Sequence, residues 1–387
     1  MKLGYDGLMP ASQSGSSVPG FDRRGFLLAA GGGVSGGITL AAGAAVPQGQ
    51  PAARAKLGLD LFSLRSQGWS AFELLDFAAR LGVDVVHFSE PRFLGSLEEA
   101  HLRKVKEHAD RLGPALEVGF GSICPTSSRF NKDQGSPAEQ LLRMFRVAKI
   151  LGSPFVRCYL GSSLDRGGQV PLEQHIENTI ASCKSVRSQA LDLGIKIAIE
   201  NHAGDLQALQ LKALIEEAGR DYVGALIDAG NATWTLEDPH HTLETLAPYA
   251  LASGVRDSAI WLTGKGADVM WVPLGEGNVD LRGWTRRFIQ LCPGMAFSLE
   301  IINVRAPRSF DFLDPRFWAA YREVPAWVFA GFLNRARQGS PSTQVPSGPQ
   351  GEPPDSPAFR QFLVEQERRD VERDVATARQ MLTEASA

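Results

Sequence analysis

The sequence has no large excess of charge of either sign. Its 387 residues carry a formal net charge of -3 at pH 7, with a pI near 6.2. Proteins that bind nucleic acid through its phosphates usually present a strongly basic surface, so we expect no nucleic acid partner. At 43% hydrophobic and 21% charged residues, the composition is that of an ordinary globular protein.

Cysteine is also scarce. The four cysteines, at positions 124, 158, 183 and 292, lie far apart with no C-x-x-C spacing. An oxidising compartment would permit disulfides, but the sequence cannot pair them. We interpret them as small core residues.

The sequence lacks an apolar run suited to a stable membrane-spanning helix, since five glycines between 31 and 37 interrupt the one N-terminal candidate. Arg23 and Arg24 precede Phe26 and Leu27, and the apolar run that follows ends in small residues. This order is typical of a signal peptide and resembles a twin-arginine (Tat) signal. We therefore expect residues 1–45 to direct export by the Tat machinery, to the periplasm or outside the cell. The alternative is a chance pair of arginines before an apolar N-terminal helix.

From residue 57 onward, short apolar runs alternate with amphipathic stretches. Strand, helix and strand repeated in this way indicate a parallel sheet. No glycine-rich phosphate turn follows the first run, and eight runs over about 250 residues fit a (β/α)8 barrel. We predict an α/β TIM barrel over residues 57–305. The runs are LGLDLFSL from 57, VDVVHFSE from 83, ALEVGFGS from 115, PFVRCYLG from 154, IKIAIEN from 195, VGALIDAGN from 223, ALASGVRDS from 250 and AFSLEI from 296.

The pattern changes after residue 305. Residues 306–339 are rich in aromatic side chains and predict a helical extension that packs on the barrel. Residues 340–357 are rich in proline and serine, which favours a flexible linker. Residues 358–387 predict a charged C-terminal helix with a thin apolar stripe. That stripe either pairs with a partner or a second subunit in a homo-oligomer, or belongs to a solvated surface helix.

Three of the apolar runs end in acids: Glu200, Asp228 and Glu300. In a barrel the carboxyl ends of the strands meet on one face, where ionised carboxylates would repel one another and lose hydration. A divalent cation with oxygen ligands is the simplest compensation. The alternative is that each acid faces outward and caps a helix or pairs with an arginine.

Several motifs occur in an order that resembles the sugar phosphate isomerase/epimerase family, whose members have the xylose isomerase-like TIM barrel. The resemblance covers about residues 57–305. The motifs are IENH, LIDAGN followed by EDPHHTLETLAPY, RDS, VPLGEGNVD and FSLEI.

The resemblance implies a divalent metal, commonly Mn²⁺, Co²⁺, Mg²⁺ or Zn²⁺, held by Glu200, Asp228 and Glu300. It also implies that Glu200 and Glu300 flank a substrate carbon, so that one removes a proton and the other returns it. Proton removal beside a carbonyl gives an enediolate, whose charge a cation stabilises.

One departure from the family pattern concerns the metal. The family usually has His-x-Lys-Asp on its seventh strand, and its histidine completes the metal shell. Here Gly254 stands at the histidine position, while Arg256 and Asp257 match the lysine and the aspartate. Either His202 or water then completes the shell, or the metal binds weakly or not at all.

Other residues at the ends of the runs are candidates for substrate binding. His202 is a candidate acid/base or hydroxyl ligand. Candidates for contacts to substrate oxygens are Glu90, Arg157, Asn231, Arg256 and Asp257. The alternative for Arg157 and Arg256 is that they neutralise the acid cluster, and the alternative for Glu90 is that it caps a helix. The tryptophans at 234, 261 and 271 are candidates for stacking on a sugar ring or for packing. His240 and His241 start a helix away from the strand ends, and we expect them to be solvated.

We therefore expect a metal-dependent isomerase or epimerase that acts on a sugar, ketose or related polyol. A lyase or dehydratase acting on a keto-sugar would begin with the same proton abstraction. A carbohydrate-binding barrel without catalysis is the third alternative, because Gly254 removes a metal ligand. A nuclease on the same fold is disfavoured by the net negative charge and the small number of histidines at strand ends.

Overall fold

The computed structural model describes residues 55–303, 306–341, 348–349, 353 and 356–386. The expected signal peptide at 1–45 and most of the expected linker at 340–357 lie outside the described residues. Among the described helices, none is long and apolar enough to cross a membrane.

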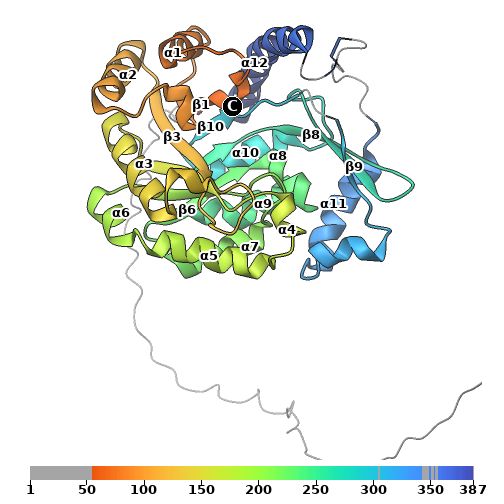
Figure 1. The fold of residues 1–387 in the computed structure, drawn as a ribbon. Helices are drawn as coiled ribbons and strands as arrows, with labels where there is room; N and C mark the ends of the chain where they lie inside the picture. Colours follow the sequence, from red (N-terminus) through yellow and green to blue (C-terminus); the bar gives the residue numbers. More distant parts are fainter. Residues whose placement is uncertain (1–54, 304–305, 342–347, 350–352, 354–355, 387) are drawn as a thin grey trace, which may run out of the picture. The chain divides into compact units, whose positions relative to one another are not determined.

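Eight parallel strands form the main sheet, and each lies, to within one residue, inside one of the eight apolar runs, so the predicted TIM barrel is confirmed. The strand order is β10-β1-β2-β3-β4-β5-β6-β7 (Figure 1). The strands are β1 (Lys56–Asp60), β2 (Val85–Phe88), β3 (Ala115–Ser122), β4 (Phe155–Tyr159), β5 (Lys196–Glu200), β6 (Val223–Asp228), β7 (Ala250–Gly254) and β10 (Ala296–Leu299).

The barrel closes between β7 and β10 through a side chain and a short bridge. Ser253 Oγ donates to the Ala296 carbonyl at 2.7 Å and accepts from the Ser298 N–H at 3.1 Å. Just beyond β7, the Val255 N–H donates to the Ser298 carbonyl at 2.7 Å. These bonds bring the ends of β7 and β10, and the residues that follow them, to one place.

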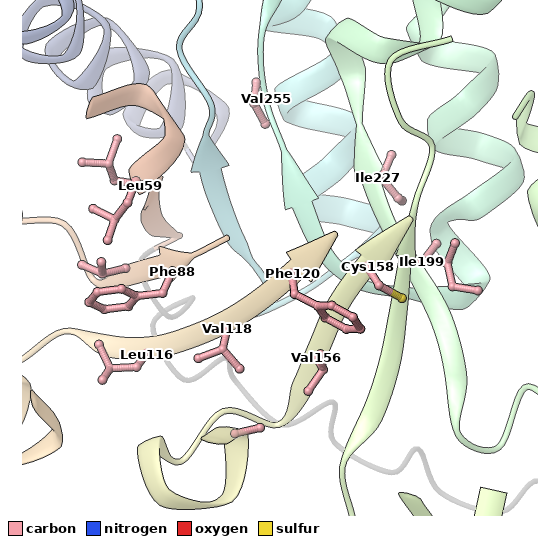
Figure 2. Packing of buried hydrophobic residues seen from close by; sticks show 14 of the residues in the cluster. Leu59, Phe88, Leu116, Val118, Phe120, Val156, Cys158, Ile199, Ile227 and Val255 are labelled. Atoms are coloured by element: carbon pink, nitrogen blue, oxygen red, sulfur yellow. The ribbon is translucent and has the colours of Figure 1, made fainter. Parts of the chain in front are cut away.

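Side chains alternate between the two faces of the sheet, as strand geometry requires. The outer set forms the main core with the surrounding helices, and Figure 2 shows several of its members on neighbouring strands: Leu59, Phe88, Val118, Val156, Cys158, Ile199 and Ile227. Phe155, Ala198, Leu226 and Ala252 form a separate cluster, the apolar floor of the barrel interior. On β4, β5 and β6, the next inward-facing residues after this floor are Arg157, Glu200 and Asp228. The alternation of side chains along a strand therefore directs these groups into the barrel.

The helices surround the sheet (Figure 1). Several begin with the signals expected from sequence; in α1, for example, Ser70 accepts from the Glu73 N–H while Glu73 accepts from the Ser70 N–H, a capping box. All four cysteines are buried and free, as predicted for core residues. The helices are α1 (Ala71–Arg80), α2 (Glu99–Leu112), α3 (Pro137–Leu151), α4 (Ser163–Arg166), α5 (Leu172–Lys184), α6 (Arg187–Leu193), α7 (Ala208–Ala218), α8 (Ala229–Ala232), α9 (Pro239–Leu246), α10 (Leu281–Leu291), α11 (Ala326–Gln338) and α12 (Pro357–Ser386), with 3-10 turns η1 (Leu61–Leu64), η2 (Pro91–Leu94), η3 (Lys132–Gln134), η4 (Thr233–Thr235), η5 (Ala247–Tyr249) and η6 (Pro315–Ala320).

A second, three-stranded antiparallel sheet was not expected. It consists of β8 (Asp257–Leu262), β9 (Ala267–Val272) and β11 (Arg308–Phe310), in the order β11-β9-β8. The run from 250 therefore holds two strands: β7 ends at Gly254, and Asp257 begins β8. Helix α11 and its neighbouring aromatic side chains pack on this small sheet, in a cluster that includes Ile260, Val269, Phe310 and Phe332.

The C-terminal helix α12 packs on the barrel of its own chain. Val371, Val375 and Leu382 of the predicted apolar stripe are buried in the main core. The buried Glu367 carboxylate accepts from Ser66 N at 2.9 Å, from Ser66 Oγ at 2.8 Å and from Gln67 Nε2 at 3.2 Å. It also lies 3.4 Å from Arg65 Nη1. The three residues of the stripe are therefore neither solvated nor covered by a separate partner. The barrel of the same chain covers them.

We predict that Glu367→Ala lowers the free energy of unfolding by about 2 to 4 kcal/mol, because it leaves the half-buried donors of Ser66 and Gln67 without their acceptor. Urea denaturation measures the change. Glu365→Ala on the same helix removes an exposed carboxylate paired with Arg369, and it should cost less than about 1 kcal/mol. Equal stability of the two variants would contradict the anchoring role of Glu367.

Candidate functional site

A cavity of about 200 Å³ lies at the carboxyl end of the barrel strands. In TIM barrels this end carries the loops and side chains that act on ligands. The cavity is lined by Phe62, Ser89, Glu90, Arg129, Arg157, Tyr159, His202, Ala203, Asn231, Arg256, Trp271, Glu300 and Ile302. Seven of these residues were candidates from the sequence: Glu90, Arg157, His202, Asn231, Arg256, Trp271 and Glu300.

The three predicted acids converge. Glu200 ends β5, Asp228 ends β6 and Glu300 directly follows β10, and one carboxylate oxygen of each lies within 4.8 Å of the others. All three side chains are buried. Of the three, only Glu300 is part of the cavity wall.

The Arg256 guanidinium lies among the three acids. Its Nη2 atom donates to Asp228 Oδ2, lies 3.1 Å from Glu300 Oε2 and lies 3.9 Å from Glu200 Oε1. Burial alone would lower the pKa of Arg256, but the charges of Asp228 and Glu300 raise it above its usual value. The guanidinium is therefore a fixed positive charge at the centre of the acid cluster.

Arg157 provides a second positive charge on the other side of Glu200. Its Nε and Nη2 atoms both contact Glu200 Oε2, and its Nη1 donates to the Phe120 carbonyl at 3.2 Å. Asn231 covers the other oxygen, since its Nδ2 donates to Glu200 Oε1 at 2.9 Å. Burial raises the pKa of Glu200 well above its usual value, against the effect of Arg157. Glu200 is thus enclosed by its partners, whereas Glu300 faces the cavity.

Asn231 retains an unused acceptor. Its backbone N–H donates to Asp228 Oδ1 at 2.6 Å and its Nδ2 is bound to Glu200, but its buried Oδ1 has no hydrogen-bond partner among the described residues. A buried acceptor without a partner is costly, and a ligand hydroxyl could satisfy it.

His202 is held as a neutral imidazole. Its Nδ1 lies 2.7 Å from the Gly161 carbonyl, so Nδ1 carries the proton and Nε2 is left as an acceptor. Burial, with the charge of Arg157, lowers the pKa of His202 well below its usual value. The ring stacks on Tyr159 with 3.8 Å between centroids.

Two of the predicted substrate ligands differ in their placement. Glu90 lies in the cavity wall and pairs with Arg92. Asp257 is not part of that wall: its Oδ2 accepts from Gly275 N at 2.8 Å and Gly277 N at 3.1 Å, so it holds the loop after β9. His240, which we expected to be solvated, is partly exposed and lies 3.0 Å from the Asp280 carbonyl.

Trp271 supports Arg256. The Arg256 Cζ atom lies 4.1 Å from the centroid of the Trp271 ring, and the Trp234 ring stacks on Trp271 at the same centroid distance, 4.1 Å. Two groups cannot share one face of a ring at that distance, so they occupy opposite faces. Trp271 therefore has no free face for a sugar ring. Trp261, the third tryptophan considered, is buried in a small cluster of the β8–β9 hairpin.

Sequence reasoning missed Asp60, the last residue of β1. Asp60 is buried, accepts from Phe62 N at 2.8 Å and from Ser89 Oγ, and lies 3.5 Å from His87 Nδ1. Burial, with the charge of Glu300, raises its pKa to about 7. Asp60 lies in the middle of the apolar run LGLDLFSL, so a search for polar residues at the ends of the runs did not mark it. Tyr159 and Arg129 were also missed, and no comparable pattern marks them.

The donor set fits a divalent ion only in part. Three carboxylate oxygens within reach of one another are suitable ligands. However, Gly254 provides no side chain, and a Cβ built at that position would lie 2.7 Å from Asp228 Oδ2. The space between the acids also holds the Arg256 guanidinium. As these residues lie, they do not fit the family's four-ligand metal site.

We predict that Asp60 makes stability depend on pH. Its folded-state pKa of about 7 exceeds the ordinary value of 3.8, so its contribution is fully present below about pH 4 and is lost as pH rises through 7. Asp60→Asn should therefore gain stability relative to the wild type between pH 5 and 9, by roughly 3 kcal/mol, because about two units of the pKa shift lie above pH 5, at about 1.4 kcal/mol per unit. Urea unfolding at both pH values measures this.

The matched control is Asp192→Asn, which changes an exposed carboxyl on α6. Its stability relative to the wild type should be the same at both pH values. A difference between Asp60→Asn and the wild type that does not change with pH would contradict the raised pKa.

Comparisons with known proteins agree with the fold. Among solved structures, D-psicose 3-epimerase in the presence of D-fructose has a TM-score of 0.54 at 14% identity, covering 84% of this chain and 99% of that one. D-psicose 3-epimerase with D-tagatose from Clostridium cellulolyticum H10 has a TM-score of 0.52 at 12% identity, with 73% and 99% covered. L-ribulose 3-epimerase has a TM-score of 0.50 at 17% identity, with 82% and 97% covered. At these identities the likeness establishes the fold alone.

No curated protein sequence matches the chain. The sequence model described as "Xylose isomerase-like TIM barrel" matches residues 75–320, which is more than half of the chain and includes β2 to β10 with all three acids. The chain therefore belongs to the xylose isomerase-like TIM barrel family.

Proposed function

We propose that the protein is a sugar isomerase or epimerase, which moves a proton at a carbon beside the carbonyl of a sugar, ketose or related polyol. The observation that carries the proposal is the cavity itself. One carboxylate, Glu300, shares its wall with a neutral histidine, His202, and with the guanidinium groups of Arg157 and Arg256. A base, a hydrogen-bond acceptor for a hydroxyl group and fixed positive charge are the groups that enediolate chemistry requires.

Glu300 is the proposed base. It removes the proton from carbon, and the negative charge that develops on the substrate oxygen faces Arg157 and Arg256. Neutral His202 accepts a substrate O–H at Nε2, and the unpartnered Oδ1 of Asn231 accepts another. Glu90 on the rim is a further hydroxyl ligand.

Glu200 has a different place in this arrangement. Its carboxylate is covered by Arg157 and Asn231, so in this structure it holds these two residues rather than facing the cavity. Return of the proton to the neighbouring carbon by Glu300 alone gives an isomer. Return to the opposite face of the same carbon gives an epimer and needs a second group, for which Glu200 is the candidate from sequence. The pairing of Glu200 with Glu300 stays a prediction.

Solved structures with the same fold support the substrate class. Two of these proteins are D-psicose 3-epimerases, one in the presence of D-fructose and one with D-tagatose, and a third is an L-ribulose 3-epimerase. We therefore propose ketoses as the first compounds to test.

The test is incubation of the protein with a panel of ketoses in deuterated water, followed by NMR. Deuterium entering the product with every oxygen retained supports isomerisation or epimerisation. Loss of a hydroxyl supports the lyase alternative. Binding of a sugar with no exchange and no product supports a carbohydrate-binding barrel, and overturns the proposed reaction.

We predict that Glu300→Gln abolishes both deuterium exchange and turnover, lowering kcat at least about a thousandfold, because the base is removed. Glu98→Gln changes an exposed carboxylate before α2 and should leave both rates unchanged. Full activity of Glu300→Gln on a verified ketose would show that another group removes the proton.

Glu200→Gln separates the two roles of Glu200. We expect exchange and turnover to fall together, by about ten- to a hundredfold, because Arg157 loses the charge that holds it. If exchange persists while only the product is lost, Glu200 is the second proton-transfer group and the paired-glutamate arrangement holds. The two rates are measured in the same NMR experiment.

We also propose that the protein is exported by the Tat route, on the Arg23-Arg24 motif. Replacing both arginines with lysine should retain the full chain in the cytoplasm, because the Tat machinery reads the arginine pair. Cell fractionation followed by immunoblotting measures this. Export of the double variant at the wild-type level would contradict a Tat signal.

A further inference from the structure

We propose that Arg256 is a built-in cation that takes the place of the divalent metal in this barrel, so that the acid cluster is complete without an ion. The binding part of the proposal concerns this chain alone. Its catalytic part rests on the proposed function, since Arg256 would also stabilise the charge that develops on the substrate.

Arg256 occupies the position that a metal bound by the three acids would need. A metal that bridges Glu200, Asp228 and Glu300 must lie between their oxygens, which are within 4.8 Å of one another. One atom, Arg256 Nη2, lies within 3.9 Å of an oxygen of each of these acids. An ion and this nitrogen cannot occupy the same space.

Arg256 is also held in place by contacts with residues other than the three acids. Its guanidinium lies 4.1 Å from the centroid of the Trp271 ring. Trp271 is itself fixed by the Trp234 stack and by a hydrogen bond from its Nε1 to the Gly230 carbonyl at 3.1 Å. A Cβ at Gly230 would lie 2.7 Å from Arg256 Cβ, so the stem of the arginine fills the available space. The guanidinium could move only if its contact with the Trp271 ring and its ion pair with Asp228 were broken at the same time.

Gly254 stands at the position where the family pattern has a histidine ligand, so it provides no side chain to a metal. Gly254 lies opposite Asp228 in the β6–β7 register. A Cβ there would come within 2.7 Å of Asp228 Oδ2, the oxygen that pairs with Arg256. The missing side chain thus makes room for the Asp228–Arg256 pair. Gly254 provides no metal ligand, and Arg256 provides a positive charge at the same carboxylate.

The chemistry of the two cations differs in one useful respect. A guanidinium does not lose its proton in proteins and cannot be extracted by a chelator. Arg256 lies in the cavity wall, so its remaining N–H groups can donate to the oxygen of an enediolate. Its Nε is buried and has no hydrogen-bond partner in the described structure.

The experiment is metal binding by the purified, folded protein without substrate. Mn²⁺ is titrated and followed by electron paramagnetic resonance and calorimetry, and Co²⁺ is titrated and followed by its visible absorption. For the wild type we expect no stoichiometric binding of either ion. We expect no change in the thermal midpoint with Mn²⁺, Co²⁺, Mg²⁺ or Zn²⁺, and no change after dialysis against EDTA.

Two variants rebuild the metal site. Arg256→Ala removes the internal cation, and we expect one equivalent of Mn²⁺ or Co²⁺ to bind and to raise the thermal midpoint. Adding Gly254→His provides the fourth ligand and should tighten binding at least about tenfold, with the Co²⁺ absorption of a nitrogen-containing site. Arg103→Ala, which removes an exposed arginine from α2, is the matched control and should bind no metal.

The wild type alone can overturn the proposal, whether or not the variants fold. One equivalent of Mn²⁺ bound to the wild type, and lost in Glu300→Gln, would mean that Arg256 moves aside for an ion. Failure of the proposed function gives a different result: no ketose is turned over, while the wild type still binds no metal. Turnover that survives EDTA supports both proposals.

Discussion

The site depends on one physical constraint: carboxylates buried side by side must be balanced by positive charge. Asp60, Glu200, Asp228 and Glu300 all lie inside the mouth of the barrel, where water does not hydrate them freely. Each comes from the end of a different strand, because the period of two along a strand turns every second side chain inward. The fold therefore creates the repulsion, and Arg157 and Arg256 relieve it.

The parts of the chain outside the eight strands support this balance. The β8–β9 hairpin carries Trp271, whose ring lies against Arg256, and Asp257 at the start of β8 fixes the loop that follows β9. Helix α12 fixes the segment after β1 through Glu367 and so secures the region next to Asp60. The β8–β9 hairpin, which sequence reasoning did not predict, thus contacts the site directly, whereas α12 anchors the segment that follows β1.

The sequence was sufficient for the eight strands and for the meeting of the three acids, because both follow from local patterns: apolar runs and the polar residue at the end of each. It was not sufficient for the ends of β7 and β8. The run ALASGVRDS reads as one strand, and only the pairing of Ser253 with β10 and of Asp257 with the β9 loop divides it. For Arg157 and Arg256 the sequence left two roles open, contact with substrate and neutralisation of the acids, and only the structure shows that Arg256 lies among three acids from different strands. Asp60 was missed because it stands in the middle of the run LGLDLFSL, whereas Glu200 stands near the end of its run.

Gly254 illustrates how a departure from a family pattern acquires meaning from geometry. In the sequence it is a lost ligand, which by itself favours a weaker metal or a barrel without catalysis. In the structure the inward position of residue 254 faces Asp228, and Arg256 reaches the same carboxylate from two residues further along the chain. A carboxylate cluster that had lost its ion and gained nothing would be left with uncompensated buried charge, which costs several kcal/mol. The pairing of Arg256 with Asp228 and Glu300 removes that cost. In the proposed arrangement, Gly254 leaves room for the Asp228–Arg256 pair, and Arg256 provides the positive charge that a bound cation would otherwise supply.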